Sequence, residues 1–579
     1  MGKIGESIIL ALLAIVTWGS RFYYSSQFGL YEDDHYRVPV AMAWTWSNFW
    51  EYLARIPQSQ LRMEGQGRML HSGLIFGLSF LGEQLGGLSA IYWLGYCIVA
   101  LNTLLFYYLL KRLSGQAFFA TTGAIAFALF PADTTQAFLT HALGVQPGLT
   151  LLLVSLHGYS FKTRLRSLLS YCCIFLSLFI YEKFFLVFLA APLLRRSPPR
   201  IRELLRHAAI MGVLLMGVLI ARKASGESRV SELDPLAVFK VITDSVLGPV
   251  VSVAMFIYRP ITGLVSLQTD WFIPLALFFL ISVYVLYQTH QTSRDRAADP
   301  FTFNDLYRWA IIGLSLLVLA YPLTLIGVVG EISGRGSRVH VAAVVGASIL
   351  CACACSAIAS IATARHKQPL AMLGLSAFFT LLLAFGFTIQ RDFVTSWRYQ
   401  QAFWSDLITL CPDMTADTVI LVEQYALKDT QQIMARSPYM NRVLNLIYQF
   451  PANWKPFVNE SSVFTPTSRT RPPVIYRLQR NWSDPLADDV SGNRLKLTQN
   501  TIVYHRLAKA TPEVESSNLI VIEARNGQLS RRTEPLPGDG RTFPLKPPDL
   551  TIEPPSFEEG ILYPYLIRAQ GEQPIQYIQ

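Results

Sequence analysis

Long apolar runs alternate with short polar segments through the first two thirds of the chain. Most of these runs are close to the length of about 20 residues that an α-helix needs to cross a bilayer. The sequence therefore predicts an all-α, polytopic membrane bundle over residues 1–390, with about eleven spans. The predicted spans are 7–23, 88–110, 116–131, 142–160, 167–181, 183–194, 207–221, 271–287, 308–328, 341–362 and 369–389.

The apolar run at 167–194 is too long for a single span. It is interrupted by three polar residues, Tyr181, Glu182 and Lys183, near its middle. Because charged groups are costly at membrane depth, we expect two short helices that turn at this triplet.

A second apolar stretch, 244–264, contains Pro249 and Pro260. Proline removes a backbone donor and clashes with the preceding helical turn, so the two prolines predict a break. We expect an interfacial or re-entrant segment on the outer side of the membrane rather than a full span.

The pattern changes near residue 391. One more helical stretch is followed by the run "TVILVEQYAL", which is typical of a strand, and by "MNRVLNLIYQF", which is typical of a helix. Further strand-like runs are "VIYRLQR", "LKLTQNTIVYH" and "NLIVIEA", separated by turns rich in Pro, Gly and Asp. Residues 391–579 therefore predict a soluble α/β or α+β domain.

Composition and charge agree with a membrane location. The chain is 52% hydrophobic and only 15% charged, with a formal net charge of +10. Most of the basic residues lie in short loops between apolar runs, which is the pattern that sets membrane topology, so we expect no nucleic-acid partner. Placing the basic loops inside puts the first loop, 24–87, and the C-terminal domain outside a plasma or inner membrane.

An acidic triplet stands directly after the first span, in "GLYEDDHYRVP". Glu32, Asp33 and Asp34 repel one another, so the triplet keeps its charge most readily beside a cation. Such carboxylates serve as ligands of a divalent metal or as a base that takes a proton from a hydroxyl. The alternative is a plain N-cap, since Asp before a periodic apolar stretch commonly begins a helix.

Arginines recur on the side where the positive-inside rule predicts few. They include Arg68 in the first loop, and Arg335 and Arg338 in "GEISGRGSRVHV", which also holds His340. Guanidinium groups bind phosphate well, so we expect these arginines to hold an anionic headgroup. Glu182 is either a second catalytic acid or substrate contact, or half of a polar cap with Lys183 at a helix turn.

Three stretches resemble the GT-C glycosyltransferases, which include protein O-mannosyltransferases and lipid A aminoarabinose transferases. "EDDHY" is similar to the acidic pair of that family, which is followed shortly by an aromatic residue, here Tyr36. "GQGRMLHSGL" resembles a Gly-Arg-Pro-Leu element, with Met69 in place of the proline, and "SLFIYEKFFLVFLAAPLL" resembles a Tyr-Glu segment.

The resemblance implies an inverting enzyme that moves a sugar from a polyprenyl-phosphate carrier in the membrane lipid to an unknown acceptor. The first acid of the family maps to Glu32 or Asp33 and the second to Asp33 or Asp34. We expect Asp33 to be the base or acceptor-orienting group, with Asp34 supporting it. A divalent metal is compatible with the triplet, although some members of the family act without one.

Two other classes of function remain open. A transporter or lipid flippase for an anionic substrate would use Glu182 and the arginines to line a path, but the sequence has no inverted repeat. A non-catalytic receptor would use the C-terminal domain to bind a partner. The enzyme hypothesis requires the acids and the arginines to act on one lipid headgroup.

Overall fold

The computed structural model describes most of the chain. The described residues are 3–423, apart from 63–67, 136, 162, 196–199, 225–234, 297–301, 325–327 and 417, then 440–451 and short stretches between 474 and 567. Contacts divide the chain into two compact units, which we describe separately. The membrane unit comprises Met1–Phe28 and Trp44–Asp392, and the second unit comprises Gly29–Ala43 and Phe393–Gln579.

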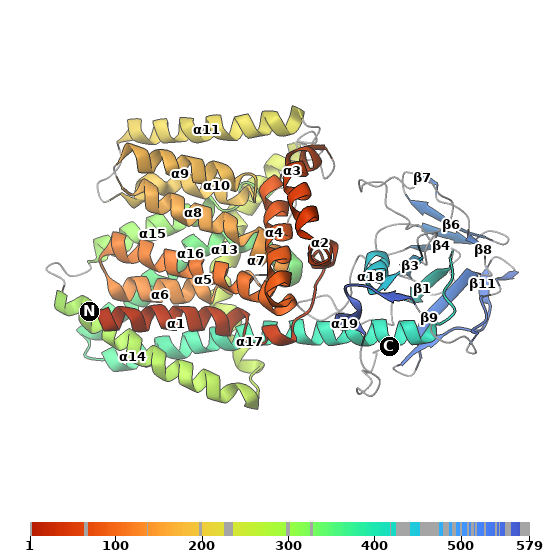
Figure 1. Cartoon of the computed structure of the whole chain (residues 1–579). Coiled ribbons are helices and arrows are strands. Elements are labelled where there is room, and N and C mark those ends of the chain that lie inside the picture. The colour runs from red at the N-terminus through yellow and green to blue at the C-terminus, as the bar shows by residue number, and fades with distance from the viewer. Residues whose placement is uncertain are drawn as a thin grey trace. The chain divides into compact units, whose positions relative to one another are not determined.

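The membrane unit is built almost wholly from helices. Figure 1 shows α1, α5, α6 and α8 running side by side, in agreement with their contacts. The α-helices are α1 (Lys3–Arg21), α3 (Trp46–Arg62), α4 (Met69–Gly86), α5 (Leu88–Ser114), α6 (Ala117–Ala128), α7 (Leu139–Gly144), α8 (Gln146–Tyr159), α9 (Arg164–Ser177), α10 (Lys183–Val187), α11 (Ile201–Ala224), α13 (Pro235–Val265), α14 (Phe272–Arg296), α15 (Phe303–Val318), α16 (Val344–Ala364) and α17 (Gln368–Leu410). Short 3-10 helices are η1 (Ser25–Gln27), η2 (Phe188–Leu194), η3 (Thr269–Trp271) and η4 (Gly334–Ala343).

Each of the eleven predicted spans contains a helical element, and eight helices in the described part of the chain are long and apolar enough to cross a membrane. Seven of the eight lie in predicted spans, and the eighth is α13. The other four predicted spans hold the shorter α6, α9, α15, and α10 with η2. The protein is therefore an integral membrane protein, and the predicted all-α bundle is confirmed.

Small residues let the central helices approach closely. Gly346 of α16 faces α15, where a Cβ atom would lie 2.4 Å from the backbone nitrogen of Leu317 and 2.5 Å from the carbonyl oxygen of Gly313. Backbones that touch in this way pack through van der Waals contact, which is the main attraction between helices in lipid. The α15–α16 pair is thus fixed by glycine at two positions.

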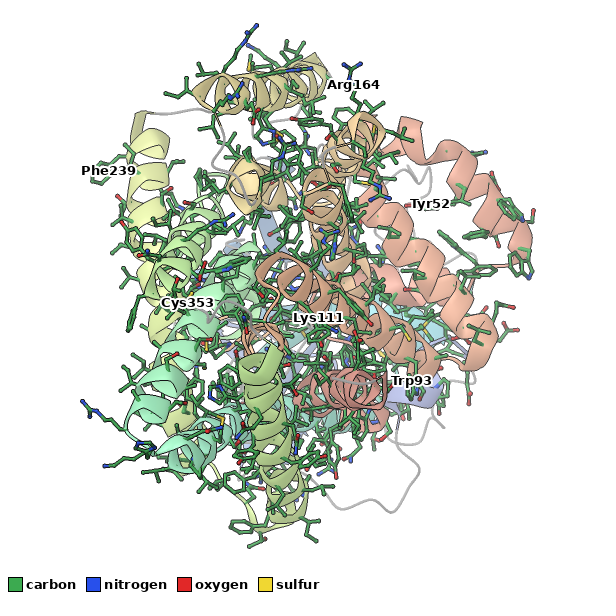
Figure 2. All side chains as sticks on the ribbon, turned by 90° about the vertical axis from the view of Figure 1, so that its left-hand side faces the viewer. Tyr52, Trp93, Lys111, Arg164, Phe239 and Cys353 are labelled. Carbon is green, nitrogen blue, oxygen red and sulfur yellow. The ribbon has the colours of Figure 1, made fainter. Side chains whose placement is uncertain are left out.

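Several basic loops meet at one end of the bundle, which we call the basic end. Lys111 of α5 pairs with Glu6 of α1 at 2.6 Å, and Arg112 hydrogen-bonds Ser160 after α8. The start of α6 is tied to α14 there, because the Phe118 amide donates to Ser293 at 3.2 Å. Figure 2 looks onto this end, where Lys111 and Arg164 are labelled.

The polar triplet divides the long apolar run as predicted. Helix α9 ends at Ser177, a turn contains Tyr181 and Glu182, and α10 begins at Lys183 and continues into η2. The prediction of a break at the prolines was wrong, however. Helix α13 is continuous, with Pro249 and Pro260 inside it. Prolines are tolerated in membrane helices because neighbouring groups satisfy the freed carbonyls.

The second unit contains a mixed sheet of four strands in the order β10-β9-β1-β3. The central strand β1 (Val419–Glu423) runs parallel to β3 (Val474–Leu478) and to β9 (Leu519–Arg525), and β10 (Gln528–Arg531) pairs antiparallel with β9. The predicted strand-like runs "TVILVEQYAL", "VIYRLQR" and "NLIVIEA" supply β1, β3 and β9.

The remaining elements of the second unit are short. Its helices are α2 (Asp34–Met42), α18 (Met440–Ile447), α19 (Tyr563–Leu566) and the end of α17. Its other strands are β2 (Tyr448–Gln449), β4 (Leu486–Asp488), β5 (Arg494–Leu497), β6 (Thr501–Arg506), β7 (Lys509–Ala510), β8 (Val514–Glu515), β11 (Leu536–Gly538), β12 (Arg541–Phe543) and β13 (Glu558–Glu559). This mixture of helices and strands is the α/β or α+β domain that the sequence predicts.

Candidate functional site

The acidic triplet lies in a tight turn of the second unit, residues 31–35, which we call the acid turn. The Tyr31 hydroxyl donates to the Phe393 carbonyl at 2.9 Å, and the Gln400 side-chain amide donates to the Leu30 carbonyl at 3.1 Å. Both partners lie on α17, more than 360 positions away in the sequence. At Gly29, a Cβ atom would overlap the Trp397 ring, so only glycine fits there.

The three carboxylates differ in their surroundings. Glu32 is buried and has a φ of 46°, a left-handed conformation that non-glycine residues rarely adopt. Asp34 is also buried, and its carboxylate accepts a weak 3.4 Å bond from the Tyr31 amide. Asp33 is half-buried and stands at the N-cap of α2, but its side chain makes no capping hydrogen bond to that helix. A helix-capping role therefore does not account for the presence of an aspartate at position 33.

His35 ends the acid turn, and Arg442 contacts the Tyr36 ring that follows it. His35 is fully buried, and its Nδ1 lies 3.4 Å from the Glu32 carbonyl oxygen. Burial lowers the pKa of His35 to about 4, so the ring is neutral at neutral pH. The guanidinium of Arg442, on α18, lies 4.2 Å from the centre of the Tyr36 ring. The contacts of α17 with the acid turn and of α18 with Tyr36 were not predicted from the sequence.

Arg68 and Glu182 form a close ion pair in the membrane unit. Arg68 Nε donates to one carboxylate oxygen at 3.0 Å, and its Nη2 lies 2.5 Å from the other. Arg222 approaches the same carboxylate at 3.9 Å. Burial would raise the pKa of Glu182, but the two guanidinium groups outweigh it and hold the pKa at about 2. Glu182 is thus an ionised partner of arginines rather than a cap for Lys183.

Lys183 lies next to this ion pair, and the carboxylates of Glu182 and Asp133 act on its charge electrostatically without direct contact. Its side chain is only 6% exposed, and within the described residues its ammonium makes no ion pair or hydrogen bond. It lies 5.5 Å from the Tyr181 ring centre, and the Arg68 guanidinium lies 4.6 Å from the same ring. An isolated buried ammonium is costly unless an anion binds to it.

Tyr181 lies among the positive charges of this region. The charges of Lys183, Arg68 and Arg338 all act electrostatically on its phenol. Arg335 and Arg338 together with Lys183 also act electrostatically on His141. Four cations of the membrane unit act electrostatically on Tyr181 or on His141, and we call them the cationic cluster: Arg68, Lys183, Arg335 and Arg338.

The loop that carries Arg335 and Arg338 is the 3-10 helix η4, and its glycines and Ser337 define its position. Gly334 has a φ of 58°, and a Cβ atom at Gly336 would overlap the Glu331 carboxylate. Ser337 accepts a hydrogen bond from the Thr134 amide at 3.0 Å, and its hydroxyl lies 2.9 Å from that of Thr134. Arg335 and Arg338 therefore lie on a loop whose position is fixed by the contact between Ser337 and Thr134.

His340, which is also in η4, belongs to a buried hydrogen-bond network. Its Nδ1 lies 2.8 Å from the Tyr321 hydroxyl and 3.1 Å from that of Ser252. The two hydroxyls are 2.5 Å apart. This arrangement agrees with a structural hydrogen-bonding role for His340.

Asp133 is a second buried carboxylate of the membrane unit. One oxygen accepts from the Thr135 amide at 2.9 Å and from its hydroxyl at 2.5 Å, and the other has no hydrogen-bond partner among the described residues. Burial raises the pKa of Asp133 despite the charges of Arg21 and Lys183. The next helix, α7, begins only at Leu139, so Asp133 does not cap a helix.

The predicted site residues thus fall into two groups. Glu32, Asp33, Asp34 and Tyr36 belong to the second unit, and the remaining five belong to the membrane unit. Those five are Arg68, Glu182, Arg335, Arg338 and His340. That the two groups act on one headgroup stays a prediction. Among the described residues, no group of three His, Cys, Asp or Glu side chains is arranged to hold a metal ion.

Comparison with known proteins gives a loose similarity in structure. No protein family and no curated protein matches the chain. Among solved structures, the chain is similar to the crystal structure of ArnT from Cupriavidus metallidurans bound to undecaprenyl phosphate. The sequence identity is 12%, and the match covers 73% of this chain and 83% of that chain with a TM-score of 0.37. A similarity this loose assigns neither a fold family nor an activity.

Proposed function

We propose that this protein is a GT-C-type membrane glycosyltransferase. It moves a sugar from a polyprenyl-phosphate-linked donor to an acceptor at the outer face of the membrane, with inversion at the anomeric carbon. The observation that carries the proposal is the cationic cluster, where the buried Lys183 ammonium has no ion-pair partner among the described residues.

The cluster fits a lipid-linked phosphate in charge and in setting. Guanidinium groups form bidentate hydrogen bonds to phosphate oxygens, and an ammonium adds a point charge. Glu182 neutralises part of the charge of Arg68 and Arg222, and Lys183, Arg335 and Arg338 add further positive charge to the cluster. A chain with many apolar helices offers the lipid tail an apolar surface next to these cations.

The acid turn supplies the base in this proposal. The Asp33 carboxylate takes the proton of the acceptor hydroxyl while the hydroxyl oxygen attacks the anomeric carbon opposite the phosphate. The bond from that carbon to the phosphate oxygen breaks, and the polyprenyl phosphate leaves with the electron pair. The cations stabilise its charge, and the proton on Asp33 passes to water. Asp34 and the neutral His35 hold Asp33 in position.

Sugar transfer from radiolabelled polyprenyl-phosphate donors by the purified protein in lipid nanodiscs tests the proposal. We expect the natural chain to release polyprenyl phosphate and Asp33→Asn to lose at least 100-fold in kcat, because the amide cannot accept the proton. Donor affinity should be unchanged in this variant.

Three outcomes would contradict the proposal. Equal transfer by Asp33→Asn would remove the assigned base. Absence of transfer from every polyprenyl-phosphate donor would reject the activity. Movement of an anionic lipid between leaflets of proteoliposomes without any covalent change would favour the flippase class instead.

A further inference from the structure

Helix α13 (Pro235–Val265) touches the bundle at one end only. Lys240 donates to the Thr324 carbonyl at 3.3 Å, Ser252 contacts Tyr321, and Arg259 hydrogen-bonds the Ile332 carbonyl. These partners follow the end of α15 or lie in the loop before η4. All of them lie at the end opposite the basic end, where α15 begins near Arg195.

The length of α13, taken together with these contacts, gives the direction in which the helix runs. From Lys240 to Gly263 the helix rises about 35 Å, which is more than the thickness of the hydrocarbon core. Gly263 packs against the Leu381 carbonyl of α17, and Arg259 stacks on Phe385, close to where Gly386 meets Ser20 at the end of α1. A helix parallel to the bundle would reach both ends over this distance. Helix α13 therefore lies across one end of the bundle.

Figure 2 agrees with this orientation. The ribbon that carries Phe239 runs across the view, whereas α5, which carries Lys111, is seen nearly end-on. The length and composition of Phe239–Val265 would suit a membrane span, but its contacts do not.

The exposed side of α13 is a single apolar stripe. Its members recur every three or four residues, which places them on one helical face. Val250 is 62% exposed and Ile257 is 72% exposed. The stripe consists of Phe239, Ile242, Val246, Val250, Val253, Ile257, Ile261 and Leu264. The opposite face carries the buried polar residues Asp244, Ser252 and Arg259.

We propose that α13 lies in the plane of the membrane surface, with its apolar stripe in contact with the boundary between lipid headgroups and acyl chains. The partner of this surface is lipid. An apolar stripe of this size is stable only when covered, and an apolar helix face next to a membrane-spanning bundle is buried 5–10 Å into that boundary. The polar face meets the Tyr321–His340 network, so the loop of Arg335 and Arg338 lies at headgroup depth.

Cysteine labelling from one side of the membrane tests this placement without relying on catalysis. The variants are Thr243→Cys and Thr262→Cys, at partly exposed positions near the two ends of α13. Arg164→Cys, at the exposed basic end, marks the opposite side. A membrane-impermeant maleimide is added to intact cells, with and without permeabilisation, and the labelled residues are identified by mass spectrometry.

We expect both α13 cysteines to react from the same side, and Arg164→Cys to react only from the other side. If α13 crossed the bilayer, Thr243→Cys and Thr262→Cys would react from opposite sides. If the stripe were buried in the bilayer core or covered by a second copy of the chain, neither would react. Either result, or labelling of all three from one side, would overturn the proposal, whether or not the protein transfers sugar.

Discussion

The Lys183 side chain is expected to lower the stability of the empty protein and to favour anion binding. Its buried ammonium has no ion-pair partner among the described residues, yet it lies beside Tyr181 and near Arg68. The sequence identified Arg68, Arg335 and Arg338 because arginines stood on an unexpected side of the membrane. It missed Lys183, because a Glu-Lys pair at a helix turn is typical of a polar cap. The three-dimensional structure shows that Glu182 forms its ion pair with Arg68.

Replacing Lys183 should improve stability and weaken binding. In Lys183→Met we expect the midpoint of thermal unfolding to rise, because a buried charge without a partner is removed. Affinity for a polyprenyl phosphate should fall about 10- to 100-fold, or ~1.4–2.8 kcal/mol. Differential scanning fluorimetry and lipid-binding titration measure the two effects. Lys183→Arg keeps the charge and should keep most of the affinity, and equal binding by Lys183→Met would remove Lys183 from the site.

His35 should make stability depend on pH. Its folded-state pKa is about 4, below the ordinary value of 6.5. As pH falls from 6.5 to 4, the unfolded chain binds a proton that the folded chain does not, so folding stability decreases, by at most on the order of 3 kcal/mol. His35→Asn should reduce this decrease when unfolding midpoints at pH 7 and pH 5 are compared.

His366 provides the matched control for this measurement. It is exposed and has a φ of 56°, a conformation that asparagine also tolerates. His366→Asn should therefore keep the pH dependence of the natural chain. An unchanged dependence in His35→Asn would show that His35 is not the group that titrates.

At the scale of elements, the apolar runs predicted the helices of the eleven spans, since a span must bury its backbone within itself, but they did not predict α3 and α4 in the first loop. The turn at Tyr181–Glu182 was also predicted, because charge marks it. The continuity of α13 was not predicted. The buried Pro249 and Pro260 remain inside a helix that packs on α15, α16 and η4, and such packing overrides local proline rules.

The close approach of α15 and α16 should make Gly346 sensitive to a single methyl group. Gly346→Ala places Cβ against the Leu317 backbone, which cannot rotate away, so we expect a loss of ~1–3 kcal/mol in unfolding free energy. Gly374→Ala on α17 meets nothing within 4 Å and should be neutral or slightly stabilising. Thermal unfolding of the two variants gives the comparison, and equal midpoints would mean that α15 and α16 separate at little cost.

At the scale of the whole molecule, the sequence predicted a membrane part followed by a soluble part. It gave no reason to group Gly29–Ala43 with residues after 392, because that grouping depends on contacts such as Tyr31 with Phe393. Pairings across more than 360 positions leave no local pattern in a single sequence. The residue types of the candidate site were therefore predictable, but their supporting side chains were not.

The division into two units predicts a separation of binding from transfer. A chain that lacks residues 412–579 keeps the whole cationic cluster but loses α18, whose Arg442 lies over Tyr36. We expect it to bind polyprenyl phosphate with unchanged affinity and to transfer no sugar. Binding titration and the transfer assay on the same preparation measure both properties. Loss of binding would place part of the donor site in the second unit.

The loop fixed by Ser337 and Thr134 has one more consequence. It keeps like charges together even when no ligand separates them, so the empty protein carries internal repulsion in its fold. A bound phosphate would reduce this electrostatic repulsion. The ligand-bound protein should therefore resist heat and proteases better than the empty one. The lifetime of the protein in its membrane would then follow the supply of the lipid that it uses.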